Sequence, residues 1–532
     1  ALVRRLGALL GDESVAKGAH VLLAPTINLH RNPLGGRNFE CYSEDPVLTG
    51  QIAVGFIRGV QGRNVATTPK HFVANDSEFE RNSIDTQVDE RTLREVYLAP
   101  FEQAVKDGDA WGIMSSYNRV NGTFASEHEW LLGDVLRDQW GFDGFVVSDW
   151  FAARSTAASV RAGLSLEMPG RGSFYGAEQI SSAIDRGEID EDHLNRIARD
   201  VLVVQERTGV LDGVAVESER PLDRPEDRAL IREAGAAGTV LITNDGTLPL
   251  EPSALSSIAV IGPNARVAKI MGGGSATVRA YRAVSPLAAL EARLGASTEI
   301  RYAQGCSIDR STPPLAMPLL DGRLELEFYD NLDCEGPVVA TSDSGNGRIM
   351  FFGDPADGVR AQHFSFRARG TVVPQATGRH AFRLVQCGRA RVLVDGAVVI
   401  DATEGHYDRG DEFFSFGSVE IEGQVDLVEG EAVEVTVEFS ARDALLMSGM
   451  RLGLVSLVER DLVAEAAVLA ADSDVALVVV GTNDDWETEG RDRDLFDLPG
   501  DQVALIRRVS AANPRTVVAV NTGGPHGMDW LD

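Results

Sequence analysis

The sequence predicts an α/β protein: a parallel sheet or barrel of βα units, followed by a second α/β domain that is interrupted by a β-sandwich. Three observations lead to this prediction. Residues 1–206 alternate strand-like and helix-like segments. After a polar linker at 207–228, residues 229–312 and 457–532 carry a second pattern of the same kind. Residues 313–456, between those two halves, have short alternating strands and turns rich in Gly and Asp.

The barrel prediction depends on a repeated βα pattern. Its strand candidates are short apolar runs at 20–24, 65–68, 112–115 and 145–147, and its clearest helical stretches are 89–106 and 129–139. Repeated βα units of this size are typical of a parallel sheet or barrel.

The second α/β pattern supplies strand candidates on both sides of the insertion. They are residues 239–242, 258–261, 475–480 and 516–520. Two pairs of buried-type strands far apart in the chain indicate one domain split by an inserted module. Within the insertion, residues 324–328, 380–384 and 433–437 alternate apolar and polar side chains, which predicts antiparallel strands of a β-sandwich.

Charge and cysteine content exclude several classes of protein. The 532 residues include 80 acidic and 50 basic side chains, a net charge of −30. Such a charge disfavours nucleic acid and anionic membranes as partners. No apolar run reaches the roughly 18 residues that span a bilayer, so we expect a soluble protein. We expect no cofactor and no metal, and a homo-oligomer is left open.

The cysteines and the chain ends bear on localisation. The four cysteines lack metal-ligand spacing and form no dense disulfide framework, although Cys334 and Cys387 remain a candidate pair. This pattern favours a reduced compartment and hence the cytoplasm. The chain begins at Ala1 rather than Met, and both ends are expected to be incomplete, so secretion stays an alternative.

A carboxylate follows one of the predicted barrel strands directly. The apolar run 145–147 continues into Ser148, Asp149 and Trp150. An Asp in this place has two interpretations. It can cap the next helix, or it can be a catalytic side chain, because barrel enzymes carry these at the C-terminal ends of their strands.

Polar residues also follow the other strands. Arg37 follows the first, Lys70 and His71 the second, and Tyr117 the third. Each has a structural interpretation of its own: a surface Lys-His pair, a core tyrosine, or an Arg paired with Glu40 or Glu44. Together they would place cations around Asp149 and keep it ionised, as a nucleophile requires. Hydrogen-bond donors beside the ring of Trp150 also suit a polyhydroxylated sugar.

The segment 135–150, VLRDQWGFDGFVVSDW, resembles the active-site signature of glycoside hydrolase family 3. Residues 36–40, 70–72, 116–118 and 163–170 are similar to further blocks of that family in the same order. The resemblance covers nearly the whole chain. It implies that Asp149 is the nucleophile.

The resemblance also implies the other site residues. Those that would bind the sugar are Arg37, Lys70, His71, Arg81, Met114, Tyr117, Trp150 and Ser275. The acid/base would come from the loop 483–493 of the second domain. Glu489 is preferred because residues 489–493 are similar to the family pattern Glu-Gly-x-Asp-Arg, and Glu487 is the alternative.

The insertion, with its segments Gly378–Phe382 and 394–399, is similar to the PA14 β-sandwich that some β-glucosidases of this family carry at the same place. Three departures from the family stand out. The early Asp-Gly-Pro segment is absent, so the (β/α)8-like barrel that the resemblance implies, followed by an α/β sandwich domain, is expected to be N-terminally incomplete, without its first strand. Ser165 stands where the family has Asp. The second domain is expected to be incomplete at its C-terminal end.

The function that the resemblance implies is a retaining, exo-acting β-glucosidase, an O-glycosyl hydrolase. It would release terminal non-reducing β-D-glucosyl residues from a small glycoside or oligosaccharide through a covalent glycosyl-enzyme. A β-xylosidase or an α-L-arabinofuranosidase of the same fold is an alternative, and so is a non-catalytic carbohydrate-binding protein. An N-acetylglucosaminidase is disfavoured, because the His-rich loop of that subgroup is not seen.

Overall fold

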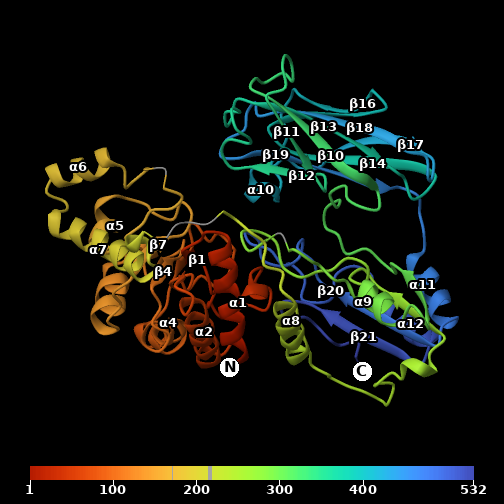
Figure 1. Ribbon diagram of the computed structural model, residues 1–532, viewed down its shortest axis with the longest axis horizontal. Helices are drawn as coiled ribbons and strands as arrows, with labels where there is room; N and C mark the ends of the chain where they lie inside the picture. Colours follow the sequence, from red (N-terminus) through yellow and green to blue (C-terminus); the bar gives the residue numbers. More distant parts are fainter. Residues whose placement is uncertain (171, 214–217, 279, 532) are drawn as a thin grey trace. The chain divides into compact units, whose positions relative to one another are not determined.

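The computed structural model describes residues 1–170, 172–213, 218–278 and 280–531. The chain forms two compact units, the first made of residues 1–306 and 465–532 and the second of residues 307–464 (Figure 1). The first unit contains both α/β regions predicted from the sequence. Each unit is described by itself below.

The N-terminal region of the first unit is an array of short parallel strands. In chain order they are β1 (Val21–Leu22), β2 (Ala66–Thr67), β4 (Gly112–Ser115) and β7 (Phe145–Ser148). β1 pairs with β2 and β4 pairs with β7. Parallel bridges at Thr26↔Lys70, Phe72↔Ser115 and Val147↔Leu166 continue the array. Each new strand therefore lies beside the preceding one, as βα repeats require.

The barrel that the sequence predicts, incomplete at its N-terminus, is not closed in the described residues. Closure requires a pairing between the first and the last strand of the sheet. Throughout the described ranges, the pairing ends at β1 on one side and at Leu166 on the other. The N-terminal region is therefore an open parallel array, and its strand ends still share one edge.

Helices cover this array. They are α1 (Leu2–Ala16), α2 (Pro46–Gln61), α3 (Glu90–Thr92), the π-helical turns η2 (Leu93–Tyr97) and η4 (Trp130–Gln139), α4 (Ala99–Lys106), α5 (Ala157–Ala162), α6 (Ala177–Asp185), α7 (Glu191–Arg207) and α8 (Pro225–Gly238). Asp45 caps α2 by accepting the N–H groups of Val47 and Leu48. Glycines let α1 and α2 cross closely, because a Cβ at Gly7 would lie 2.4 Å from the carbonyl oxygen of Phe56.

Shorter elements join these helices and strands. They are η1 (Asn38–Glu40), β3 (Asp85–Thr86), β5 (Arg119–Val120), β6 (Thr123–Phe124), η3 (Ala125–Glu127), η5 (Val210–Asp212) and η6 (Pro252–Ala254). Phe72 packs edge-to-face against Phe101 at 5.2 Å and against Trp140 at 6.1 Å between ring centroids. This aromatic cluster lies in the core and fixes the segment that carries Lys70 and His71.

Ser165 is buried and stands where the family that the sequence resembles has Asp. A neighbouring helix supplies a carboxylate at this place instead. The Ser165 hydroxyl donates to Asp200 Oδ2 at 3.0 Å and accepts the N–H of Val146 at 3.1 Å. Asp200 belongs to α7 and also accepts a hydrogen bond from Arg137 Nη2 at 2.8 Å. The departure at residue 165 is therefore satisfied within the fold.

The C-terminal region of the first unit is a parallel sheet with the order β21-β20-β8-β9. Its strands are β8 (Ser257–Ile261), β9 (Glu299–Ala303), β20 (Val475–Gly481) and β21 (Thr516–Asn521), and its helices are α9 (Pro286–Leu294), α11 (Leu462–Ala471) and α12 (Gln502–Ala512) (Figure 1). β8 and β20 are adjacent although more than 200 residues separate them in sequence. One sheet is thus built from both sides of the insertion.

The predicted strand at 239–242 is wrong. Val240, Leu241 and Ile242 have no strand structure and are 77%, 63% and 59% exposed. A β-branched run becomes a strand only where a neighbouring strand accepts and donates its backbone hydrogen bonds. Neither edge of the described sheet pairs with these residues.

The second unit contains two antiparallel sheets that share one core. One sheet has the order β11-β10-β13-β18-β15-β16 and the other β12-β19-β14-β17. The strands are β10 (Leu320–Tyr329), β11 (Ala340–Ser344), β12 (Arg348–Phe351), β13 (Ser365–Val372), β14 (Gly378–Cys387), β15 (Arg389–Val394), β16 (Ala397–Ala402), β17 (Ile421–Leu427), β18 (Val433–Ser440) and β19 (Ser448–Ser456), with the short helix α10 (Glu412–Ser415). Buried side chains such as Phe366, Phe382 and Phe439 fill the core.

The candidate disulfide is wrong, since all four cysteines are free thiols. Cys334 Sγ donates to the carbonyl oxygen of Phe366 at 3.5 Å, and Cys387 Sγ donates to that of Phe416 at 3.4 Å. Among the helices described, none is long and apolar enough to cross a bilayer.

Candidate active site

The carboxyl ends of the parallel strands bring the predicted site residues together. Asp149 directly follows β7, and Tyr117 lies two residues after β4. Lys70 and His71 follow β2. Asp149 is buried, with only 7% of its surface exposed. The site therefore forms at the edge where the sequence pattern predicted it.

The two carboxylate oxygens of Asp149 have different surroundings. Oδ1 accepts hydrogen bonds from the Tyr117 hydroxyl at 2.9 Å and from the backbone N–H of Trp150 at 2.7 Å. Oδ2 lies 3.4 Å from His71 Nε2 and has no hydrogen-bond partner within the described structure. One oxygen is held in place while the other remains available for a reaction.

Burial is the largest influence on the ionisation of Asp149, and it raises the pKa of this carboxyl group. Arg37 and the N–H of Trp150 act in the opposite direction, and the negative charge of Glu489 raises the pKa further. The two carboxylates are thus close enough to influence each other. Asp149 needs its neighbouring donors to stay ionised.

Hydrogen bonds identify the tautomer of His71. Arg37 Nη1 lies 3.2 Å from His71 Nε2 and can only donate, so Nε2 is the acceptor. His71 Nδ1 therefore carries the proton and donates to Asn28 Oδ1 at 3.1 Å. Burial, followed by the charges of Arg37 and Lys70, holds the pKa of His71 well below its usual range. The imidazole is neutral, and its Nε2 cannot donate to Asp149.

Arg37 lies between the two carboxylates of the site. It is 7% exposed and donates through Nε to Glu40 Oε1 at 2.5 Å, which is the structural pairing that the sequence left open. Its Nη1 is also 3.6 Å from Glu489 Oε1. The buried Nη2 has no protein partner in the described ranges. Arg37 therefore joins the N-terminal array to the second α/β region and keeps one donor uncommitted.

Lys70 completes the charged set. Burial and the nearby Arg37 lower the pKa of its ammonium group, whereas Glu40, Asp149 and Glu489 raise it. Burial of a cation among several carboxylates is favourable only when their charges compensate for lost hydration. The charge of Lys70 thus interacts with the charges of the same cluster of side chains.

Glu489 reaches this cluster from the loop that follows β20. Its Oε1 accepts a hydrogen bond from Arg81 Nη1 at 2.9 Å, and its Oε2 accepts one from the backbone N–H of Ser275 at 2.8 Å. Burial alone would raise the pKa of Glu489, but Arg37, Arg81 and Ser275 outweigh burial and lower it to about 2. Among these partners Glu489 is therefore a carboxylate.

Glu487, the alternative acid/base, has a different environment. Its buried carboxylate accepts the N–H of Gly523 at 3.0 and 3.1 Å and the hydroxyl of Thr522 at 3.1 Å. These residues form the turn after β21. The hydrogen bonds of Glu487 thus stabilise the second region itself, whereas those of Glu489 reach the strand-end cluster.

The remaining predicted residues lie around these groups. The Arg81 guanidinium is centred 4.6 Å from the middle of the Tyr117 ring, a cation–π contact. Met114 is buried in a small apolar cluster, and the half-buried Trp150 packs against that cluster. Ser275 binds Glu489 through its backbone N–H. Every predicted site residue therefore lies in this region.

Sequence reasoning missed two groups that organise the site. Asn28 binds His71 three times, through the backbone N–H, the backbone carbonyl and Nδ1. Glu78 Oε2 accepts hydrogen bonds from Arg81 Nη1 at 2.9 Å and from the N–H of Gly490 at 2.7 Å. The position of Glu78 three residues before Arg81 is the feature that could have identified it.

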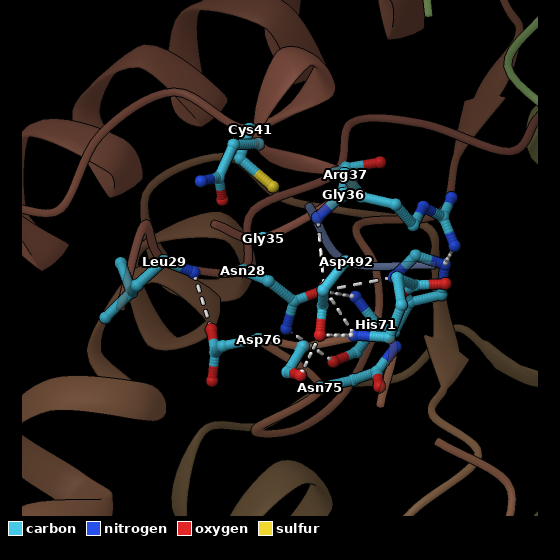
Figure 2. Close-up of a pocket in the computed structure, with 14 residues that line it drawn as sticks. Asn28, Leu29, Gly35, Gly36, Arg37, Cys41, His71, Asn75, Asp76 and Asp492 are labelled. Carbon is cyan, nitrogen blue, oxygen red and sulfur yellow. Dashed lines mark hydrogen bonds between the residues drawn. The ribbon is translucent and has the colours of Figure 1, made fainter. Parts of the chain in front are cut away.

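A small cavity of about 10 Å³ lies beside these residues, and Figure 2 shows the side chains that line it. Its lining includes Arg37, His71, Asn75 and Asp492, but neither Asp149 nor Glu489. A volume of this size accommodates about one water molecule. Within the described ranges, no group of His, Cys, Asp and Glu side chains is arranged to hold a metal ion.

Comparisons with known proteins match this chain along nearly its whole length. The model of the glycosyl hydrolase family 3 N-terminal domain matches residues 1–204, and that of the family 3 C-terminal domain matches residues 239–532. A β-glucosidase of Rhizobium radiobacter is 44% identical over 534 residues, which cover 100% of this chain and 64% of that relative. β-Glucosidase B of Emericella nidulans is 39% identical, with 99% and 64% covered.

Solved structures are similar over the same length. The β-glucosidase of Kluyveromyces marxianus in complex with glucose has 34% identity and a TM-score of 0.92, covering 100% of this chain and 65% of that one. DesR, a β-glucosidase of Streptomyces venezuelae in complex with D-glucose, has 31% identity and a TM-score of 0.71, covering 100% and 63%. The chain thus spans just under two thirds of the length of these relatives.

Proposed function

This chain belongs to glycosyl hydrolase family 3, and from its site we propose that the protein is a retaining, exo-acting β-glucosidase. Its substrates would be small glycosides or oligosaccharides with a terminal non-reducing β-D-glucosyl residue. The observation that most strongly supports the proposal is the environment of Asp149. Two donors bind one of its carboxylate oxygens, and its other, buried oxygen has no hydrogen-bond partner within the described structure. The β-glucosidase names of the relatives support the same assignment.

The reaction would proceed by double displacement. Asp149 Oδ2 attacks the anomeric carbon, the bond to the aglycone oxygen breaks, and Glu489 gives its proton to that oxygen. The product of this step is an ester between Asp149 and the sugar. Glu489, now a carboxylate, then takes a proton from water as the water oxygen attacks the anomeric carbon and releases Asp149.

The protonation of Glu489 has to change during this cycle. The positive charges of Arg37 and Arg81 lower the pKa of Glu489 and keep it ionised. Sugar hydroxyls that accept hydrogen bonds from these arginines, and an aglycone that excludes water, would both raise the pKa of Glu489 and let it take a proton. Once Asp149 is esterified, its negative charge is lost, and the pKa of Glu489 falls again. The carboxylate that the second step needs is thereby restored.

Donors around the nucleophile would bind the sugar. Arg37 Nη2 is buried without a protein partner among the described residues, and Lys70 lies in the same charged cluster. Neutral His71 presents no donor at Nε2, so its contribution is to hold Arg37. The half-buried ring of Trp150 supplies an apolar face. Cationic donors with one aromatic surface suit the hydroxyls and the C–H face of a hexose.

We also infer that the second unit is a PA14-like module. The sandwich of two antiparallel sheets supports this inference, as does the position of the family-like segment Gly378–Phe382 within β14. A carbohydrate-binding role for this unit does not follow from its fold alone.

The assignment is tested with the purified full-length protein and a panel of p-nitrophenyl glycosides. We expect the β-glucoside to have the highest kcat/KM, above the β-xyloside and the α-L-arabinofuranoside. Proton NMR should show β-glucose as the first-formed anomer, because double displacement retains configuration. A protein that binds sugars but hydrolyses no member of the panel would be the non-catalytic carbohydrate-binding alternative.

The hydroxyl of Tyr117 is predicted to control the acidic limb of the pH profile. Asp149 is active as the carboxylate, so activity is lost as the pH falls through its pKa. Tyr117→Phe removes a donor that favours the carboxylate, so the pKa of Asp149 should rise and the loss should begin at a higher pH. The lost hydrogen bond to a charged group, about 1.5–3 kcal/mol, corresponds to roughly a ten- to hundredfold decrease in kcat/KM.

The matched control is Tyr175→Phe. The Tyr175 hydroxyl donates to the carbonyl oxygen of Leu164 at 2.7 Å and does not contact the nucleophile. This variant should keep the wild-type acidic limb. Equal shifts of the limb in both variants would assign the effect to general loosening of the fold.

A further inference from the structure

The loop that carries Glu489 is fastened to the N-terminal array by a second carboxylate, that of Asp492. Asp492 accepts the backbone N–H of Gly36 at 3.0 Å and the hydroxyl of Ser77 at 2.5 Å. It also accepts the N–H of Glu78 at 3.0 and 3.1 Å and that of Phe79 at 3.1 Å. Figure 2 shows hydrogen bonds that converge on Asp492, among them the one from Gly36. All these donors belong to loops of the strand array, and Asp492 belongs to the second α/β region.

The surroundings of Asp492 are built to hold an anion. Consecutive N–H groups that point to one spot form a nest for negative charge, and hydrogen bonds to an ionised acceptor are stronger than neutral ones. Among the described residues, the hydrogen-bond partners of Asp492 are backbone N–H groups and one hydroxyl, with no Arg or Lys. Such a contact fixes position without competing for the arginines that surround Glu489.

Two further contacts bring the same loops together. The N–H of Gly490, the residue between Glu489 and Arg491, donates to Glu78 Oε2 at 2.7 Å. A Cβ on Gly36 would lie 1.8 Å from the carbonyl oxygen of Arg491, so only glycine allows the two backbones to approach this closely. Glu489 thus lies only a few residues from Asp492, whose hydrogen bonds connect this loop to the strand array.

We propose that Asp492 is a positioning residue of the glycosidase reaction: it docks the loop 489–492 on the segment 77–79 and thereby places Glu489 at the leaving-group oxygen. The inference rests on the proposed function. Glu489 and Asp149 come from two regions whose strands, in the described part of the chain, never belong to the same sheet. Its distance from the aglycone oxygen therefore depends on contacts between the loops, and a misplacement of 1 Å costs on the order of a hundredfold in rate.

The test compares Asp492→Asn with wild type in the full-length protein. Asn has the same shape, but it loses the charge and turns an NH2 group toward N–H donors. Displacement of Glu489 impairs protonation of the leaving group, so kcat/KM for methyl β-glucoside should fall about 10- to 100-fold. The value for 2,4-dinitrophenyl β-glucoside, whose leaving group needs no proton, should change less than threefold, by the same argument. Labelling of Asp149 by a 2-fluoro glucoside should stay near the wild-type rate.

Asp484→Asn is the matched control, because Asp484 lies in the same loop after β20 but is 57% exposed and 3.8 Å from Lys269. This substitution should leave kcat/KM unchanged for both substrates. Ser77→Ala removes one donor from the opposite side and should shift the methyl to dinitrophenyl ratio in the same direction as Asp492→Asn. It decides the question if Asp492→Asn does not fold.

Several outcomes would overturn the inference. An unchanged ratio in a folded Asp492→Asn variant would show that Asp492 does not place Glu489, and so would an equal loss on both substrates. In either case active wild-type protein would leave the proposed function intact. Inactive wild-type protein would instead reject the function on which the inference rests.

Discussion

Asp149→Asn is expected to reduce the proposed β-glucosidase turnover by several orders of magnitude, since the proposed covalent nucleophile cannot be replaced by a neutral amide. The substitution preserves side-chain shape and leaves a carbonyl oxygen to accept the hydrogen bonds of Tyr117 and Trp150. The loss should therefore appear in kcat, without unfolding detectable by circular dichroism. A 2-fluoro glucoside should label one peptide of the wild-type protein, and mass spectrometry should locate the label at Asp149.

A chemical rescue distinguishes loss of the nucleophile from other damage. In Asp149→Ala, azide can enter the vacated space and attack the anomeric carbon directly, which inverts the configuration and yields an α-glucosyl azide. Asp143→Asn is the control, because Asp143 lies in the same segment but forms a surface ion pair with Arg207 at 2.7 Å. It should retain wild-type turnover. Labelling at any residue other than Asp149 would reject the assignment.

The second large effect is expected for Glu489→Ala. General acid–base catalysis contributes about 10²–10⁴-fold, and that contribution should be lost for alkyl glucosides whose leaving group needs a proton. Dinitrophenyl β-glucoside should still form the glycosyl-enzyme, because its leaving group departs unaided. Azide should then attack that intermediate and release a β-glucosyl azide, the opposite anomer to that from Asp149→Ala.

Glu487→Ala separates the two candidate carboxylates. Glu487 accepts hydrogen bonds from Thr522 and Gly523, so its loss should lower the thermal unfolding midpoint more than Glu489→Ala does. It should not produce the selective loss on alkyl glucosides, and azide should not rescue it. If azide rescues Glu487→Ala and not Glu489→Ala, the acid/base assignment is wrong.

The sequence predicted a strand correctly where the apolar pattern of a single segment was sufficient to identify it. The runs at 112–115 and 145–147 fall in β4 and β7, and those at 258–261 and 475–480 fall in β8 and β20. The run at 239–242 has the same apolar, β-branched character and forms no strand. The difference lies in the partners: β-structure is made by pairing, and the pattern of a single segment does not contain its neighbour.

The sequence by itself determined where the candidate chemistry was to be sought. The place of Asp149 at the end of a buried strand allows a helix cap or a catalytic role, and the resemblance to glycoside hydrolase family 3 implies that it is the nucleophile. The same resemblance favours Glu489 over Glu487 through the pattern of residues 489–493. These inferences depend on motifs in the local order of residues, which the sequence records directly. The same is true of Arg37, Lys70 and Tyr117, each of which follows a strand-like run.

Only the tertiary structure decided how these groups act on one another. It brought Glu489 to Arg37 and Arg81, turned Glu487 toward Thr522, and made Nε2 of His71 an acceptor. Ionisation, tautomer and the free oxygen of Asp149 all follow from distances between residues far apart in the chain. Those distances are set by the packing of the strand array against the second α/β region, and spacing along the sequence does not contain them because electrostatic and hydrogen-bond energies depend on separation in space.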